Sequence, residues 1–246
     1  MPDLASRPPP IATEPASGPY AGYEGWKRWD RLFAPTADDR AYFAGETRGL
    51  VIAGGAVLEI GFGSGSFLAW AREMGARVCG VEVIPALIEA ARREGIELLP
   101  PDIERVADAH AGRFDTIVAF DVFEHFSLAE IFVRLDAAAT LLKPGGHLVL
   151  RFPNAQSPFG LAPQHGDPTH KTALSRGVFE QIMQQRPFAI VRYAGSHRIG
   201  GGPWRQRIGR AVRRRLQDAL GGALNAIWSQ DIPWAPVVVL VLRKSG

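Results

Sequence analysis

The chain has 246 residues, of which 46% are hydrophobic and 22% are charged, and this composition excludes a wholly disordered protein. Its single cysteine, Cys79, excludes an intrachain disulfide and a cysteine-based zinc site. The formal net charge of +3 is unevenly distributed, because residues 195–246 contain nine Lys or Arg and only two acids, whereas residues 1–194 carry an excess of acids. The basic character therefore belongs to one segment of the chain.

The N-terminal part reads as a tail followed by a helical segment. Residues 1–19 are rich in Pro, Ala and Ser, and we expect a disordered tail there. Residues 20–50 combine aromatic and charged side chains with apolar positions suited to one or two short helices, which predicts an N-terminal helical lid. Trp26 and Trp29 in this segment either cover a substrate site or pack the helix against the rest of the protein. The longest apolar run, near the C-terminus, is far shorter than the roughly 20 residues of a spanning helix. The chain also begins with prolines instead of the apolar core of a signal peptide, so we expect a cytoplasmic protein.

From Ala56 onward, apolar runs alternate with segments of helical periodicity. The expected strands cover residues 56–61, 76–82, 96–100, 113–122, 147–154, 188–195 and 235–244. The expected helices cover residues 66–75, 85–95, 128–146 and 174–185. This alternation predicts an α/β fold with a largely parallel sheet and helices on both faces, and such sheets bind ligands at the carboxyl ends of their strands.

A glycine-rich turn follows the first of these strands. Gly61, Gly63 and Gly65 form a Gly-x-Gly-x-Gly pattern between the strand and the next helix, so backbone can approach a ligand with no Cβ in the way. The dinucleotide-binding pattern would need a glycine at Ser66, and the Gly-Lys-Ser/Thr of a phosphate loop is absent. A tight turn without a ligand is the alternative explanation.

An acidic residue, Glu82, ends the second strand. A carboxylate at this point can accept hydrogen bonds from both hydroxyls of a ribose, as adenosine-type cofactors require. A solvated acid at a strand end is the alternative. Taken together with the glycine-rich turn, Glu82 favours a cofactor that contains adenosine.

The chain resembles the class I S-adenosylmethionine-dependent methyltransferases. The resemblance is carried in order by VLEIGFGSG, VCGVEV, FDTIVAFDVFEHF and LLKPGGHLVLRFPN. It implies a Rossmann-like, seven-stranded, mostly parallel sheet with helices on both faces, whose last strand, residues 235–244, is antiparallel to its neighbours. The methyltransferase domain would cover residues 51–246, with a basic amphipathic helical insertion at about 200–230, and S-adenosyl-L-methionine would be the cofactor.

The same resemblance implies a role for each matching position. Glu59 would brace the turn, Glu82 would hold the ribose, and Asp102 would meet the adenine amino group, with Asp108 as a competitor. Phe120 and Asp121, at the end of the fourth strand, would face the methionine amino group. The remaining cofactor-binding positions are Gly61, Phe62, Gly63, Gly65, Val83 and Ile84.

Candidate catalytic residues follow the fourth and fifth strands. A hydroxyl acceptor often needs a base, and His125 either serves as one or supports the cofactor loop. Residues 153–171 are predicted to form an irregular lid over the acceptor site. The lid nominates His170 as general base with Asp167 as its orienting partner; the alternative is that His170 caps a helix or locks the lid. The spacing of these residues matches no recognisable set of metal ligands, so no metal is predicted, although a cluster around Asp167 and His170 stays open.

The lid pattern PNA-x-SP followed by GD-x-TH is similar to that of methyltransferases from bacterial polysaccharide and glycoconjugate biosynthesis. The leading hypothesis is therefore O-methylation of a sugar or glycan precursor. The alternatives are a small quinone-like acceptor or an N-acceptor and, more distantly, a NAD-binding oxidoreductase or a non-catalytic scaffold that binds the cofactor. The sequence does not predict the oligomeric state.

The basic segment 204–228 has apolar residues at every fourth position and arginines mainly off that stripe, which predicts an amphipathic helix weakened by Gly209 and Gly221-Gly222. One interpretation is a helix that contacts an anionic membrane at the inner face. A second is a helix that packs its stripe on the body. Binding of nucleic acid is a third, and it is disfavoured because no RNA-binding module is recognisable.

Overall fold

The computed structural model of the protein describes residues 31–200 and 204–246. The predicted tail over residues 1–19, the first part of the predicted lid and both Trp26 and Trp29 lie outside the described residues.

Seven strands form one sheet in the order β3-β2-β1-β4-β5-β7-β6. They are β1 (Ala56–Ile60), β2 (Arg77–Val81), β3 (Glu97–Leu98), β4 (Phe114–Phe120), β5 (Leu142–Pro153), β6 (Phe188–Gly195) and β7 (Val237–Lys244). The first five strands pair in parallel, whereas β7 runs antiparallel to both β5 and β6. The expectation of a seven-stranded sheet with a reversed last strand is confirmed.

The strand order places the candidate ligand site. The chain moves outward from β1 to β2 and β3, then returns to the other side of β1 with β4. The carboxyl ends of β1 and β4 therefore lie side by side where the strand order reverses. Open α/β sheets bind their ligands in the crevice at that point.

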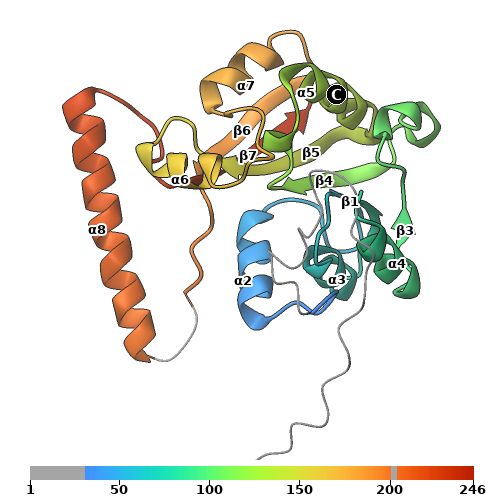
Figure 1. Cartoon of the computed structure of the whole chain (residues 1–246), viewed down its shortest axis with the longest axis horizontal. Helices are drawn as coiled ribbons and strands as arrows, with labels where there is room; N and C mark the ends of the chain where they lie inside the picture. Colours follow the sequence, from blue (N-terminus) through green and yellow to red (C-terminus); the bar gives the residue numbers. More distant parts are fainter. Residues whose placement is uncertain (1–30, 201–203) are drawn as a thin grey trace, which may run out of the picture.

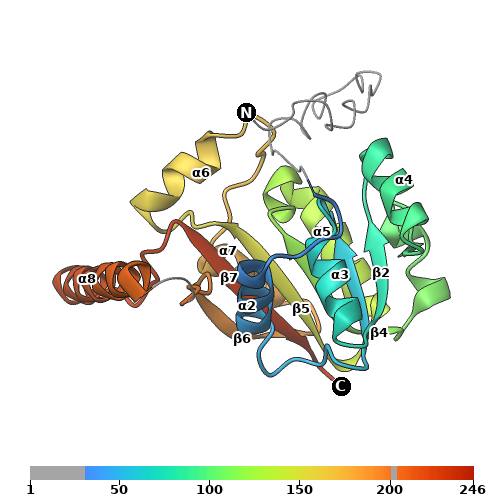
Figure 2. The same cartoon turned by 90° about the horizontal axis from the view of Figure 1, so that it is seen from below.

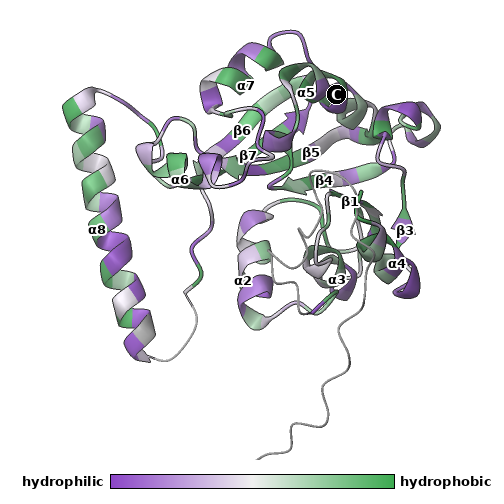
Figure 3. Cartoon of the chain, viewed as in Figure 1, coloured by the Kyte–Doolittle hydropathy of each residue, from purple (hydrophilic) through white to green (hydrophobic). Residues whose placement is uncertain are grey.

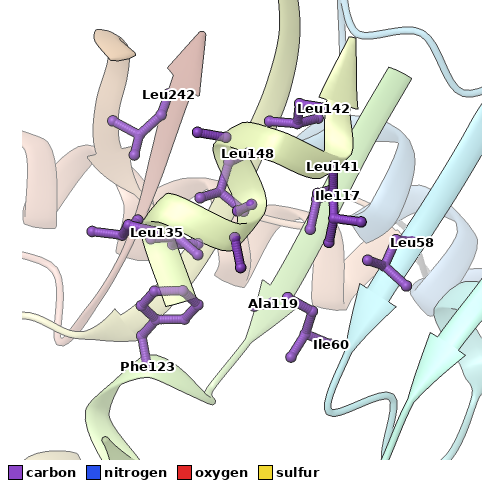
Figure 4. Close-up of a cluster of buried hydrophobic side chains, with 14 of the residues drawn as sticks. Leu58, Ile60, Ile117, Ala119, Phe123, Leu135, Leu141, Leu142, Leu148 and Leu242 are labelled. Carbon is purple, nitrogen blue, oxygen red and sulfur yellow. The ribbon is translucent and has the colours of Figure 1, made fainter. Parts of the chain in front are cut away.

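Helices cover both faces of the sheet (Figures 1 and 2). The structure describes the helices α2 (Ala37–Glu46), α3 (Ser66–Glu73), α4 (Pro85–Arg93), α5 (Leu128–Leu141), α6 (Leu161–His165), α7 (Arg176–Met183) and α8 (Trp204–Trp228), of which α8 does not lie against the sheet. Alternate residues of the central strands point to opposite faces. Leu58 of β1 and Ile117 of β4 pack in the cluster that contains Leu135 of α5 (Figure 4). Val57 and Val118 instead join the cluster beneath α2 and α3.

The helix predicted over 128–146 ends early, at Leu141, because the following residues pair with β4. Leu142 is the partner of Phe114, and the register then shifts so that Thr116 pairs with His147. The extra residues on β5 form a bulge in which Gly145 has a φ of +74°. Lys143 in this bulge donates to Asp115 at 2.7 Å. The Pro-Gly-Gly sequence therefore belongs to a distorted strand start instead of a helix end.

The lid after β5 is more ordered than predicted. It contains a 3-10 turn, Pro158–Gly160, followed directly by α6. Asn154 at its start is fully buried, and its side-chain amide donates to the carbonyls of Pro233 and Ala235 at 2.6 and 3.0 Å. The lid is thus attached to the segment that leads into β7.

The predicted basic helix is α8, one unbroken helix of 25 residues that stands away from the sheet (Figure 1). Seven large apolar residues of this helix are 52–69% exposed, so the interpretation that the stripe packs on the body is wrong; they are Trp204, Ile208, Val212, Leu216, Leu220, Ile227 and Trp228. Its last turns contact the chain that follows, where Trp234 Nε1 donates to Asn225 Oδ1 at 2.7 Å, and Asp218 in its middle pairs with Arg198 at 2.7 Å. Within the described ranges, no helix combines the length and the hydrophobicity that crossing a membrane requires.

Candidate active site

A cavity of about 570 Å³ opens at the carboxyl ends of β1, β2 and β4. Its walls come from the glycine-rich turn, the end of β2, the β4–α5 loop and one side of α2. The predicted site residues that line it are Glu59, Gly61, Phe62, Gly63, Glu82, Val83, Ile84, Phe120, Asp121 and His125. Most of the predicted cofactor-binding residues therefore meet in one cavity.

The glycine-rich turn has a backbone that side chains would disturb. Gly61 has a φ of +68°, and a Cβ there would lie 2.6 Å from Val122 of the β4–α5 loop. Gly65 has a φ of +70°, and its Cβ would lie 2.2 Å from the ring of Phe33. A positive φ favours glycine, and so does the lack of space. The turn is therefore shaped by close packing, although Gly65 itself does not line the cavity.

Glu82 holds the turn in place. Its carboxylate accepts the backbone N–H of Gly63 at 3.0 Å, of Val83 at 2.7 Å and of Ile84 at 3.2 Å. A carboxylate offers about four acceptor positions, so these three bonds occupy most of its capacity. The buried carboxylate links the end of β2 to the turn after β1, a structural role that the sequence did not suggest.

Glu59, at the end of β1, is a second buried acid in the same wall. Burial and the neighbouring Glu82 raise the pKa of Glu59 well above its usual range, and Arg151 only partly opposes them. Its Oε2 accepts no hydrogen bond within the described part of the chain. A buried carboxylate of this kind is suited to a cation or a hydrogen-bond donor supplied by a ligand.

The adenine end of the predicted site is only partly as expected. Val83 and Ile84 line the cavity, the first about half exposed and the second buried. Neither Asp102 nor Asp108 lines the cavity; Asp102 lies 3.4 Å from Arg105 in an exposed ion pair. Pro101, next to Asp102 in sequence, does line it.

Asp121, at the end of β4, is engaged by an arginine that the sequence analysis missed. Arg151 of β5 donates from Nε to Asp121 Oδ1 at 2.8 Å, and a second bond joins its Nη2 to Oδ2. Its Nη1 donates to the hydroxyl of Tyr42 on α2 at 2.9 Å. Asp121 has a φ of +56°, an unusual conformation for a residue other than glycine. Arg151 thus neutralises the acid that was expected to face the methionine amino group.

The network continues from Tyr42 to the other end of α2. The Tyr42 hydroxyl lies 2.8 Å from Ser196 Oγ, which donates to Glu46 at 2.8 Å. Burial raises the pKa of Tyr42, although the Arg151 charge opposes that rise. The signal in the sequence was an arginine within a buried strand, and such a residue needs a charged partner. This network attaches α2 to the sheet beside the cavity.

The predicted catalytic residues form one cluster, but only His125 lines the cavity. His125 Nδ1 lies 2.8 Å from Thr169 Oγ1, and Thr169 donates to Asp167 Oδ1 at 2.5 Å. The His170 ring packs edge-on against the His125 ring, with the ring centroids 4.7 Å apart. The side chain of His170 is only 7% exposed and does not line the cavity. His170 therefore lies behind His125 as seen from the cavity.

Sequence comparisons agree with this geometry. Residues 29–193 match the family described as a methyltransferase domain. A ubiquinone biosynthesis O-methyltransferase from Xanthomonas euvesicatoria is 33% identical over 107 residues, which are 41% of this chain and 44% of that protein. The match to that relative thus covers less than half of its length.

Solved structures share the fold. The structure of a SAM-dependent methyltransferase from Archaeoglobus fulgidus superposes with a TM-score of 0.56 at 19% identity, covering 83% of this chain and 90% of the other. The 1,6-didemethyltoxoflavin-N1-methyltransferase of Burkholderia thailandensis, solved with bound 1,6-didemethyltoxoflavin and S-adenosylhomocysteine, gives a TM-score of 0.53 at 15% identity, covering 91% of this chain and 84% of the other. At these identities the likeness establishes the Rossmann-like methyltransferase fold alone.

The family match extends over more than half of the chain, and it decides against the alternatives of an oxidoreductase and of a non-catalytic scaffold. The chain belongs to the methyltransferase-domain family, and it is an S-adenosyl-L-methionine-dependent methyltransferase.

Proposed function

We propose that this enzyme transfers a methyl group to a hydroxyl of a small, quinone-like aromatic acceptor. The observation that carries the proposal is the sequence similarity to an enzyme named as a ubiquinone biosynthesis O-methyltransferase. The comparisons favour this alternative over the leading hypothesis of a sugar or glycan acceptor. The aromatic character of the cavity wall supports it too, because Tyr42, Phe43 and Phe120 all line the cavity and offer faces for an aromatic ring.

The cavity residues fit the cofactor. The glycine-rich turn offers a cradle that a Cβ would fill, and Glu59 offers a buried oxygen suited to the methionine ammonium group. Glu82 would bind the ribose through the acceptor capacity that its three backbone bonds leave, while Phe62, Val83 and Ile84 would cover the adenine. Asp102 has no part in this proposal because it does not line the cavity. The bound cofactor supplies the electrophilic methyl group, so the protein has only to bind, orient and desolvate the reactants.

The acceptor hydroxyl is placed against His125 in this proposal. His125 is the member of the histidine cluster that lines the cavity, and Thr169 and Asp167 fix its ring orientation. The hydroxyl loses its proton at this cluster. An aromatic hydroxyl such as that of tyrosine, with a pKa of about 10, is more acidic than a sugar hydroxyl and needs less assistance. His170, the first candidate for a general base, does not reach the cavity and so acts behind His125.

Methyl transfer from labelled cofactor to panels of catechols, quinols and monosaccharides tests the acceptor class. Turnover on the aromatic hydroxyls is expected, and turnover restricted to sugars would overturn the proposal. His125→Ala should lower kcat/KM by about 100-fold or more, while the binding of S-adenosylhomocysteine changes little. His165→Ala, in the exposed helix α6, is the matched control and should retain activity.

A peripheral membrane contact through α8 is a separate proposal. The helix contains six arginines and one acid, Asp218, and its apolar stripe is exposed. Figure 3 shows the hydrophilic residues concentrated toward its N-terminal half and the hydrophobic residues toward its C-terminal half. Basic residues near an anionic lipid surface contribute about 1 kcal/mol each, and an exposed apolar stripe with tryptophans at the helix ends is typical of interfacial helices.

Flotation with vesicles tests the lipid contact. The protein should float with vesicles that contain phosphatidylglycerol and not with vesicles of phosphatidylcholine, and raised salt should weaken the association. Replacing Arg210, Arg213 and Arg214 by glutamine should abolish flotation without changing methyl transfer. Concentration-dependent self-association without flotation would instead identify a second copy of the chain as the occupant of the stripe.

A further inference from the structure

The histidine cluster joins two loops that are distant in sequence. Glu124 and His125 belong to the 3-10 turn Phe123–His125 after β4, and His170 lies in the lid after α6. One donor atom from each of these three side chains lies within 4.8 Å of the other two. The backbone N–H groups of Lys171 and Thr172 donate to the Glu124 carbonyl at 2.8 and 3.1 Å, which holds the loops together.

The hydrogen bond of His170 fixes which of its nitrogens faces the cluster. Its Nδ1 lies 2.9 Å from the Gln164 carbonyl oxygen. A carbonyl only accepts, so Nδ1 carries the proton, and in the neutral ring the lone pair is on Nε2. That Nε2 faces Glu124 Oε1 and Asp167 Oδ2, each at 3.9 Å. This distance is too long for a hydrogen bond.

The same reasoning applies to His125. Thr169 gives its hydroxyl proton to Asp167 Oδ1, because a carboxylate only accepts. Thr169 Oγ1 must therefore accept from His125 Nδ1, 2.8 Å away. The lone pair of the neutral His125 ring is then on Nε2 as well. Each of the two rings thus donates one N–H to an outer oxygen, and its second nitrogen is the atom that can serve as a metal ligand.

The carboxylates of the cluster add negative charge. Asp167 is buried, and it accepts the hydroxyl and the backbone N–H of Thr169 at 2.5 and 2.9 Å. Glu124 lies almost fully buried beside the two rings. Two imidazole nitrogens beside two carboxylates are donor types that transition-metal ions accept as ligands.

We propose that Glu124, His125 and His170 bind a divalent first-row transition-metal ion, with Asp167 close enough to serve as a further or alternative ligand. Ligands of one such ion, each roughly 2.0–2.2 Å from it, lie no more than about 4.4 Å apart. The two separations of 3.9 Å, from His170 Nε2 to Glu124 Oε1 and to Asp167 Oδ2, fit within that limit. Metal-binding histidines almost always donate their second N–H to a carbonyl or carboxylate, directly or through a hydroxyl, as both rings do here. Two imidazoles with carboxylate suit zinc, iron or manganese better than magnesium.

The ion would fasten the lid to the β4–α5 loop. His125 lines the cavity and His170 lies on the lid, so one ion would bridge the acceptor-side wall and the segment that covers it. This proposal does not rest on the proposed acceptor, because binding of an ion can be measured without turnover.

Elemental analysis and calorimetry test the proposal. The purified full chain is analysed by mass spectrometry for transition metals, stripped with a chelator and titrated with Zn²⁺, and Mg²⁺ is titrated in parallel. Wild type should bind about one equivalent of Zn²⁺ and no Mg²⁺, and Zn²⁺ should raise its Tm. Thr169→Val, which keeps all the proposed ligands but removes the hydroxyl that orients His125 and donates to Asp167, should bind roughly 10- to 100-fold more weakly.

The matched pair is His170→Ala, which removes a ligand, and His165→Ala, which removes an exposed histidine from the same lid. The first should lose Zn²⁺ binding and the second should bind as wild type does. Equal binding by wild type and His170→Ala, or equal losses in both variants, would overturn the proposal. If His170→Ala fails to fold, visible absorption of Co²⁺ bound to stripped wild type decides: one equivalent with nitrogen and oxygen ligands supports the site, and no bound Co²⁺ refutes it.

Discussion

The two walls of the cavity are built in different ways. On the cofactor side, Glu82 binds backbone N–H groups of a turn only 19 residues earlier in the chain, and glycines let that turn pack closely. On the acceptor side, side chains from two loops meet across 44 residues, as the bond between His125 and Thr169 shows. On the cofactor side, the backbone conformation of the turn limits which residue types fit. On the acceptor side, the arrangement of the side chains depends on the individual hydrogen bonds between them. Substitutions should therefore have different effects on the two sides.

The largest effect is expected at the glycine-rich turn. Gly61→Ala combines a positive φ with a Cβ 2.6 Å from Val122, and it should lower stability by about 2–3 kcal/mol and cofactor affinity by more than about 100-fold. Gly54→Ala is the control, because Gly54 has nearly the same φ of +69° and no atom within 4 Å of the added Cβ. It should cost about 1–2 kcal/mol and leave affinity unchanged, as measured by denaturation and calorimetry. Equal losses of affinity would contradict the close-packing argument.

The second largest loss of stability is expected from a substitution at Arg151, which lies between the two walls. Arg151→Met removes the partner of Asp121 and the donor to Tyr42. Breaking a fully buried pair costs roughly 3–5 kcal/mol, but Asp121 is 37% exposed, so we expect about 2 kcal/mol by urea denaturation. Arg72→Met breaks an exposed pair with Glu94 and should cost less than about 1 kcal/mol. Similar costs for the two variants would show that the Arg151 network does not stabilise the fold.

Glu59→Gln should separate stability from binding. The pKa of Glu59 is raised in the folded protein by burial and then by Glu82, so folding favours its protonated form. The contribution of protonated Glu59 to the stability of the fold is fully present below its pKa in the unfolded chain. It is lost as the pH rises through its pKa in the folded protein. The Tm of ligand-free Glu59→Gln should therefore exceed that of wild type by more at about pH 8 than at about pH 5. Cofactor affinity should fall roughly 10- to 100-fold through loss of a charged hydrogen bond. A Tm difference independent of pH would rule out a buried, titrating Glu59.

The smallest effect is expected far from both walls, on α8. Leu216 is 66% exposed, so Leu216→Ser should change the free energy of unfolding by no more than about 0.5 kcal/mol. Leu135→Ala, at a fully buried position of α5, should cost about 2–5 kcal/mol in the same denaturation assay. A large cost at Leu216 would mean that the stripe is covered in solution.

The sequence predicted the features that arise from local patterns. The alternation of strands and helices, the glycine-rich turn and the acid after β2 all lie in short, continuous segments, and the structure brings Gly61, Gly63 and Glu82 together. The antiparallel β7 was predicted only through the resemblance to a known family. Pairing direction depends on strands distant in sequence, so periodicity alone does not specify it.

The acceptor side was predicted less well, for a physical reason. His125, Asp167 and His170 were all nominated, but their order relative to the cavity depends on how the lid folds over the β4–α5 loop. The role of Arg151 was missed because its partners, Asp121 and Tyr42, come from other elements. Asp102 was assigned from a motif position, yet its side chain pairs with Arg105 in solvent. The early end of α5 follows from pairing with β4, which no local signal reveals.

The position of α8 between two paired strands has a consequence for the variation that the fold tolerates. Gly195 at the end of β6 pairs with Val238 at the start of β7, so the intervening segment leaves and re-enters the sheet at one place. Shortening such a connection about eightfold lowers the free-energy cost of closing the loop by only about 2 kcal/mol. The stability of the sheet therefore depends little on the length of the segment between β6 and β7. Natural variants could lose, lengthen or exchange the appendage while the catalytic scaffold stays intact, and engineers could attach a different module there.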